Sequence, residues 1–90
     1  MGVPLVSVII PNYNGDAFLD ACLSSLERLS YNNYEVILID NGSTDKSIET
    51  AKNSNLQIKI ISLETNTGFS YAVNRGIEIA NGEEYLVPKI

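Results

Sequence analysis

The sequence has no histidine and only one cysteine, Cys22. A single thiol cannot form an intrachain disulfide, and without histidine neither a mixed zinc site nor a serine–histidine catalytic pair can be assembled. Cys22 falls on the apolar side of a predicted helix, where free cysteine usually packs as a small hydrophobic residue. We therefore expect Cys22 to pack in the core and not to react.

Basic residues are also scarce, with six Lys and Arg against eleven Asp and Glu and a net charge of −5. This balance argues against binding to nucleic acid or to an anionic membrane surface. A phosphate-bearing ligand would need backbone amides, helix N-termini or a divalent metal ion instead.

Long apolar runs are absent, and so is the basic leader of a signal peptide at residues 1–6. We expect no direct membrane insertion and a cytoplasmic location. The 90 residues are enough for one domain at most, and a composition of 44% hydrophobic and 19% charged residues indicates a globular one.

Short apolar runs alternate with amphipathic stretches. Continuous apolar segments at residues 5–10 and 36–39 predict buried strands, and residues 56–60 predict a strand with one polar face. Helical periodicity covers residues 16–29, about 44–52 and 69–80, and residues 84–87 predict a last strand. This alternation predicts an α/β domain with a mostly parallel, Rossmann-like sheet between two helix layers.

The polarity of the strands predicts their order. The first two strands are apolar on both faces and should be central, whereas the third should be an edge strand. The resulting order is 3-2-1-4. Ligands of open α/β sheets bind beside a reversal of strand order, at the carboxyl ends of the strands. The loops after the first three strands therefore form the candidate site.

The first of these loops is residues 11–14. Pro11 ends the strand, and Tyr13 offers a ring or a hydroxyl to a base or a sugar, although an ordinary polar turn would read the same way. Asn14 is predicted to cap the first helix, with Asp16 near the positive end of its dipole.

The second loop is residues 40–45. Asp40 can accept the imide N–H of uracil or thymine, or can serve only as a turn carboxylate. Gly42 permits close approach, Ser43 is predicted to cap the second helix, and Asp45 is predicted to compensate the dipole of that helix.

The third loop is residues 66–69, at the start of the third helix. Its amides are candidates for facing a pyrophosphate, but Gly68 also suits a simple turn. The small residues Ala72, Gly76 and Ala80 recur at intervals of four, which predicts close packing on the sheet. Arg75 is a candidate phosphate ligand or a solvated cation.

Together these segments resemble family 2 glycosyltransferases of the GT-A fold. Residues 6–14 are similar to the opening strand and Pro-x-Tyr-Asn motif of the family, and residues 38–45 to its Asp-Asp/Asn-Gly-Ser-x-Asp loop. Residues 66–83 match its third-helix pattern, so the resemblance covers nearly the entire chain.

The resemblance implies a transferase of the EC 2.4 type that uses a nucleoside diphosphate sugar, with UDP or dTDP as the nucleotide. Asn41 replaces the commoner second Asp, a version similar to that of rhamnosyltransferases, which favours dTDP-rhamnose. The substrate-binding residues that we predict are Pro11, Asn12, Tyr13, Asp40, Asn41, Gly42, Ser43 and Gly68.

The family also has an Asp-x-Asp motif after the fourth strand that binds Mn²⁺ or Mg²⁺, and no Asp follows Asp45 here. The resemblance thus implies that residues 1–90 are a truncated N-terminal subdomain. We expect this subdomain to supply the donor-nucleotide half-site, without catalytic or metal-binding residues, and to be inactive alone. Its fourth strand would be a bare edge, which predicts self-association.

The alternative is a non-catalytic, nucleotide-binding or self-assembling remnant domain. A dinucleotide-binding oxidoreductase is disfavoured because residues 11–16 lack the Gly-x-Gly-x-x-Gly turn.

Overall fold

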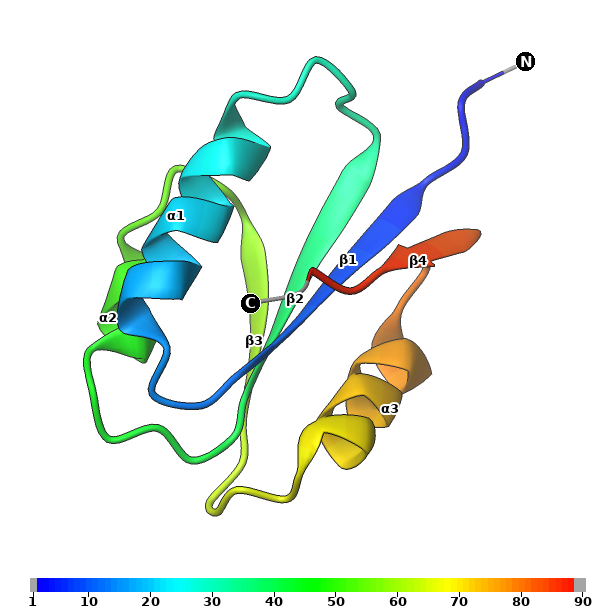
Figure 1. Ribbon diagram of the computed structural model, residues 1–90. Helices are drawn as coiled ribbons and strands as arrows, with labels where there is room; N and C mark the ends of the chain where they lie inside the picture. Colours follow the sequence, from blue (N-terminus) through cyan, green and yellow to red (C-terminus); the bar gives the residue numbers. More distant parts are fainter. Residues whose placement is uncertain (1, 89–90) are drawn as a thin grey trace.

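The computed structural model describes residues 2–88 and contains one four-stranded sheet. Helices lie on both faces of this sheet (Figure 1). Met1, Lys89 and Ile90 of the predicted 1–90 domain lie outside the described residues. The elements are β1 (Val6–Asn12), α1 (Asp16–Glu27), β2 (Tyr34–Asp40), α2 (Ser47–Lys52), β3 (Ile58–Ser62), α3 (Phe69–Ile79) and β4 (Glu84–Leu86). All pairings are parallel and the order is β3-β2-β1-β4, which confirms the predicted topology.

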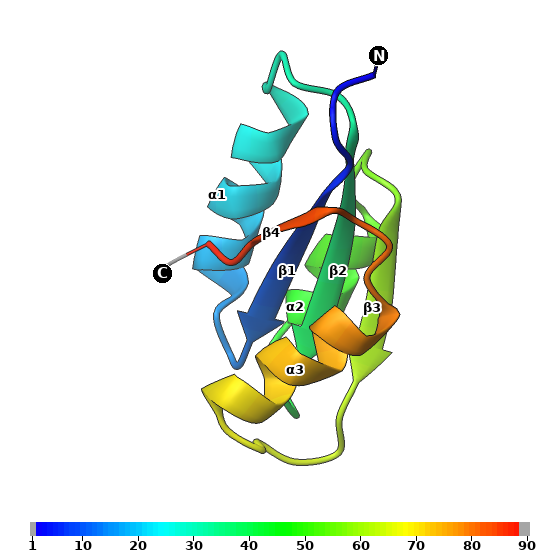
Figure 2. The ribbon, with the colours of Figure 1, turned by 90° about the vertical axis from the view of Figure 1, so that its right-hand side faces the viewer.

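The sheet separates the hydrophobic core into two clusters, one on each face. Helices α1 and α2 lie on one face of the sheet and α3 lies on the other (Figure 2). Alternate residues of β1 and β2 point to opposite faces, and because both strands are central, both sets are apolar. Toward α1 and α2 the buried strand residues are Val8, Ile10, Val36 and Leu38; toward α3 they are Ile9, Ile37 and Ile39.

Helix α3 lies very close to the sheet, as its small residues predict. Ala72 is fully buried, and a Cβ on Gly76 would lie 2.6 Å from Cγ2 of Ile9. The helical periodicity of residues 69–80 predicts that Phe69 lies on the apolar face of the helix, which is wrong, because Phe69 is 63% exposed. Phe69 is the first residue of α3, ahead of the turn that reaches the buried strands.

A cluster of hydrogen bonds that the sequence did not predict lies at the amino edge of the sheet, near the starts of β1, β2 and β4. The Ser7 hydroxyl donates to Glu35 Oε2 (2.5 Å), Asn81 N–H donates to the same oxygen (2.6 Å), and Gly82 N–H donates to Ser7 Oγ (2.9 Å). Burial raises the pKa of Glu35, but hydrogen bonds from Ser7, Asn81 and Lys59 outweigh burial and lower that pKa below its ordinary value. The cluster fixes the turn from α3 into β4.

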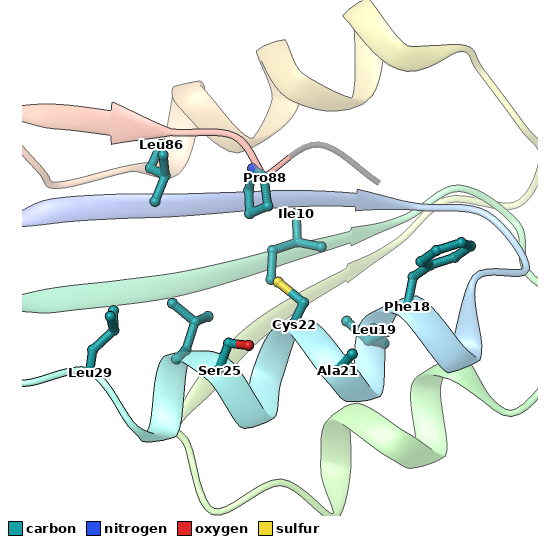
Figure 3. A pocket seen from close by; sticks show the side chains of 10 residues that line it. Ile10, Phe18, Leu19, Ala21, Cys22, Ser25, Leu29, Leu86 and Pro88 are labelled. Carbon is teal, nitrogen blue, oxygen red and sulfur yellow. The ribbon is translucent and has the colours of Figure 1, made fainter.

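An apolar cavity of about 430 Å³ lies between α1 and β4 (Figure 3). Cys22 lines it and packs against the core, as predicted, and burial raises the pKa of its thiol. Among the described residues β4 pairs only with β1, and the side chains of Tyr85 and Leu86 are about half exposed. The expected bare, apolar edge is therefore present.

No helix within residues 2–88 is both long and apolar enough to cross a membrane.

Replacing Gly76 by Ala should destabilise the fold. Its new methyl group would meet the stiff, β-branched side chain of Ile9, which is itself fully buried. Overpacking of this kind costs about 1–3 kcal/mol, whereas removing a helical glycine gains up to about 1 kcal/mol. We expect a net loss of about 1–2 kcal/mol in urea unfolding. Asn74→Ala, an exposed substitution in the same helix, is the control and should cost nothing; an unchanged Gly76→Ala would show that α3 does not lie this close.

Candidate functional site

The first three loops meet at the carboxyl edge of the sheet. Asn12 and Asp40 are register partners at the ends of β1 and β2, and Leu63 N–H donates to the Asp40 carbonyl from the end of β3. Eight predicted site residues come from these three loops and from the strand ends before them. The contacts below show which of the eight hold the loops and which are open to a ligand.

Asp40 joins the first two loops. Its side chain is 3% exposed, Oδ1 accepts a hydrogen bond from Asn12 Nδ2 (3.1 Å), and Oδ2 accepts one from Ser43 N–H (2.9 Å). This is the geometry of a turn carboxylate, one of the two roles that the sequence left open. Little of its surface is left for the N–H of a nucleobase.

Asn12 is buried beneath the same loops, with 2% exposure. Its Nδ2 also donates to Ser43 Oγ (3.3 Å), and its Oδ1 is buried without a partner within residues 2–88. A Cβ on Gly15 would lie 2.8 Å from this oxygen, so the next turn also packs against Asn12. Asn12 therefore holds the first two loops together and is not itself open to a ligand.

Asn14 does not cap α1, contrary to the sequence prediction. The N-cap residue is Gly15, and no side-chain cap is present there. Asn14 adopts a left-handed conformation (φ 51°), which turns its amide toward the second loop. Its Oδ1 accepts from Thr44 N–H (2.7 Å) and Asp45 N–H (3.2 Å), and its own N–H donates to Ser43 Oγ (2.8 Å).

The predicted Ser43 cap is likewise wrong, because α2 begins at Ser47 and not near Thr44. The hydroxyl of Ser43 instead accepts from Asn12 and Asn14. The N-cap residue of α2 is Lys46, which has no side-chain cap, and Asp45 lies just before it. Oδ1 of Asp45 accepts from Ser47 N–H (3.0 Å) and Ser47 Oγ (2.6 Å). Its Oδ2 accepts from Asp16 N–H (3.1 Å). The Ser47 hydroxyl, above all, lowers the pKa of Asp45.

Asn41 joins the second loop to the third. Its Nδ2 donates to the Gly68 carbonyl (3.2 Å), and its Oδ1 accepts from the N–H and the hydroxyl of Thr67 (2.8 Å each). Gly42 completes the contact, since at φ 82° its Cα faces the backbone of Thr65 and a Cβ would lie 3.0 Å from it. The amide of Asn41 both donates and accepts, which a carboxylate cannot do.

Among the eight predicted residues, Tyr13 is the large side chain left open to a ligand, with 52% exposure. Pro11 is half-buried and Gly68 is exposed, but Gly68 N–H is already bonded to Asn66 Oδ1 (2.9 Å). Arg75 forms an ion pair with Glu78 on its own helix. The sequence missed Asn14 and Thr67 as loop-joining residues, because their partners are about 30 residues away.

The described residues do not fit a divalent metal ion. Within residues 2–88 no group of three or more Asp, Glu, His or Cys side chains could hold one. Asp40 and Asp45 also spend both carboxylate oxygens on hydrogen bonds within the loops.

Comparison with known proteins gives a consistent result. The model of the family described as glycosyl transferase family 2 matches residues 7–88. An uncharacterized glycosyltransferase of Haemophilus influenzae is 43% identical over 86 residues, which are 92% of this chain and 34% of that protein. The chain spans between about a quarter and a third of the length of the curated relatives it matches.

Two solved structures show the same fold. S. aureus TarS superposes with a TM-score of 0.85 and 31% identity, over 92% of this chain and 16% of TarS. The mannosyltransferase PcManGT from Pyrobaculum calidifontis, in complex with GDP-Man and Mn²⁺, superposes with a TM-score of 0.82 and 25% identity, over 91% of this chain and 26% of PcManGT.

The dual role of the Asn41 amide predicts that Asn41→Asp destabilises the chain. The substitution places a carboxylate, 4% exposed at this position, against the Gly68 carbonyl and removes the donor. An unsatisfied buried group of this kind costs about 1–3 kcal/mol in urea unfolding. The control is Asn66→Asp, where the side chain acts only as an acceptor, and it should change stability by less than about 0.5 kcal/mol. Equal stability of both variants would contradict the assigned contacts.

Proposed function

The chain belongs to glycosyl transferase family 2, and we propose that its carboxyl-edge loops bind the nucleotide part of a nucleoside diphosphate sugar. In this proposal the chain contributes the donor half-site of a sugar transfer. We propose UDP or dTDP as the nucleotide, with dTDP-rhamnose as the favoured donor, because the Asp-Asn-Gly-Ser loop resembles that of rhamnosyltransferases. The complex of PcManGT with GDP-Man makes GDP the natural comparison.

One observation carries the proposal: Tyr13 is half exposed while both of its neighbours are anchored. Asn12 is buried against Asp40, and Asn14 is bonded to the second loop. An aromatic ring on a fixed backbone can stack on a base or a sugar without the entropic cost of ordering a loop. Asn41 bonds the third loop to the second, so hydrogen bonds connect all three loops.

The diphosphate should contribute little to binding by this chain. The net charge is −5, Arg75 is paired with Glu78, and the described acidic residues do not gather into a metal site. We propose that the ligands of the Mn²⁺ or Mg²⁺ ion and the catalytic base belong to polypeptide outside residues 2–88. The 90-residue chain alone then transfers no sugar, because nothing stabilises the departing diphosphate.

Calorimetric titration tests the half-site. We expect UDP and dTDP to bind, with GDP as the comparison, and Tyr13→Ala to weaken binding roughly 10-fold, the worth of one aromatic stack. Tyr85→Ala, which removes a tyrosine of similar exposure (51%) from β4, toward the amino edge of the sheet, should have no effect. Addition of Mn²⁺ should leave the affinity within about twofold, the level expected for a chain without metal ligands. If no nucleotide binds, the proposed half-site is refuted. If the 90-residue chain transfers sugar measurably, the proposal that it is inactive alone is refuted.

The exposed edge of β4 favours a second role, self-assembly. A non-catalytic remnant domain, the alternative function, could have this role as well. We propose that a second copy of the chain pairs with β4 in antiparallel orientation. Pairing centred on Tyr85 would place Glu84 opposite Leu86 of the second copy, which keeps the two Glu84 carboxylates apart and covers apolar surface.

Sedimentation equilibrium at high micromolar concentration should therefore show dimers. Leu86→Lys places a charge on the edge and should give monomers, since edge lysines block strand pairing. The matched control, Tyr71→Lys, changes an equally exposed residue on α3 and should leave the dimer intact. A wild-type chain that sediments as a monomer at this concentration would rule the edge contact out.

A further inference from the structure

We infer that Asn14 is a positioning residue that holds Tyr13 in place for the nucleotide. The inference rests on the proposed nucleotide site, and in it Asn14 affects nucleotide binding through Tyr13. Asn14 belongs to the first loop, yet all of its hydrogen bonds described above go to the second loop.

Three strong contacts fix the position and orientation of Asn14. The N–H donates to Ser43 Oγ (2.8 Å), and the side-chain Oδ1 accepts from Thr44 N–H (2.7 Å) and Asp45 N–H (3.2 Å). Backbone and side chain are thus tied to consecutive residues of one turn. These hydrogen bonds restrain residue 14 relative to the second loop.

Ser43 connects this anchor to the buried one. Its hydroxyl accepts from Asn14 N–H and also from Asn12 Nδ2 (3.3 Å), while its own N–H donates to Asp40. Tyr13 therefore stands between two asparagines that bond to the same hydroxyl. Both residues that flank it are hydrogen-bonded, while Tyr13 itself is half exposed.

The left-handed backbone of Asn14 makes the role separable from folding. Asparagine and glycine both tolerate a φ of 51°, so Asn14→Gly removes the acceptor without straining the chain. Asn14, Thr44 and Asp45 are exposed, so water can replace the lost hydrogen bonds to the two N–H groups. Stability should change little, whereas the first loop should gain freedom that a ligand must remove on binding.

A double-mutant cycle tests the inference, with UDP and dTDP as probes in two-dimensional NMR titrations of the 90-residue chain. The four proteins are wild type, Asn14→Gly, Tyr13→Ala and the double variant. We expect Asn14→Gly to weaken binding roughly 5- to 10-fold, with its urea midpoint unchanged. Because Asn14 acts through Tyr13, the double variant should bind within twofold of Tyr13→Ala.

Asn14→Asp provides the rescue. Its carboxylate can accept from the same two N–H groups, and at 150 mM salt one exposed charge is screened, so affinity should return to within about threefold of wild type. If wild type binds neither nucleotide, the proposed function fails and this role fails with it. If wild type binds and Asn14→Gly binds equally well, or the two substitutions act additively, the proposed function stands and the positioning role is overturned.

Discussion

The hydrogen bond between Asn12 and Asp40 is the interaction on which the carboxyl edge depends. It joins the ends of two buried parallel strands, and both side chains are almost fully buried. Ser43 then bonds to both of them, and Asn14 bonds to Ser43. These contacts are connected, so they link the first two loops to the ends of the core strands. The polar residues at this edge serve first to build a rigid surface.

That order of dependence changes how the family motifs are understood. Asp40 and Asn41 resemble residues that hold a nucleotide, but here most of their polar atoms are bonded within the protein. Asn41 donates to the Gly68 carbonyl, a contact that an ionised aspartate could not make. In our account the nucleotide meets Tyr13 and the surface around it, while the buried residues of the motifs keep that surface in place.

The sequence was sufficient for the sheet and its order, because continuous and alternating apolar runs distinguish central strands from edge strands. It also predicted the close approach of α3 through Ala72 and Gly76. It failed at Asn14, Ser43 and Phe69. Asn14 and Ser43 are of residue types that often cap helices, yet their hydrogen-bond partners lie about 30 residues away in the sequence. No local sequence pattern encodes such partners. Phe69 fits a helical stripe, but its place in the first turn leaves it exposed.

The central claim is that the three loops form one nucleotide-binding surface around Tyr13. Chemical-shift mapping with saturating UDP or dTDP tests it most directly. The account predicts shifts that concentrate on residues 11–14, 40–45 and 66–69. Amides that line the apolar cavity between α1 and β4 should stay unchanged. Shifts confined to that cavity, or no shifts at millimolar nucleotide, would contradict it.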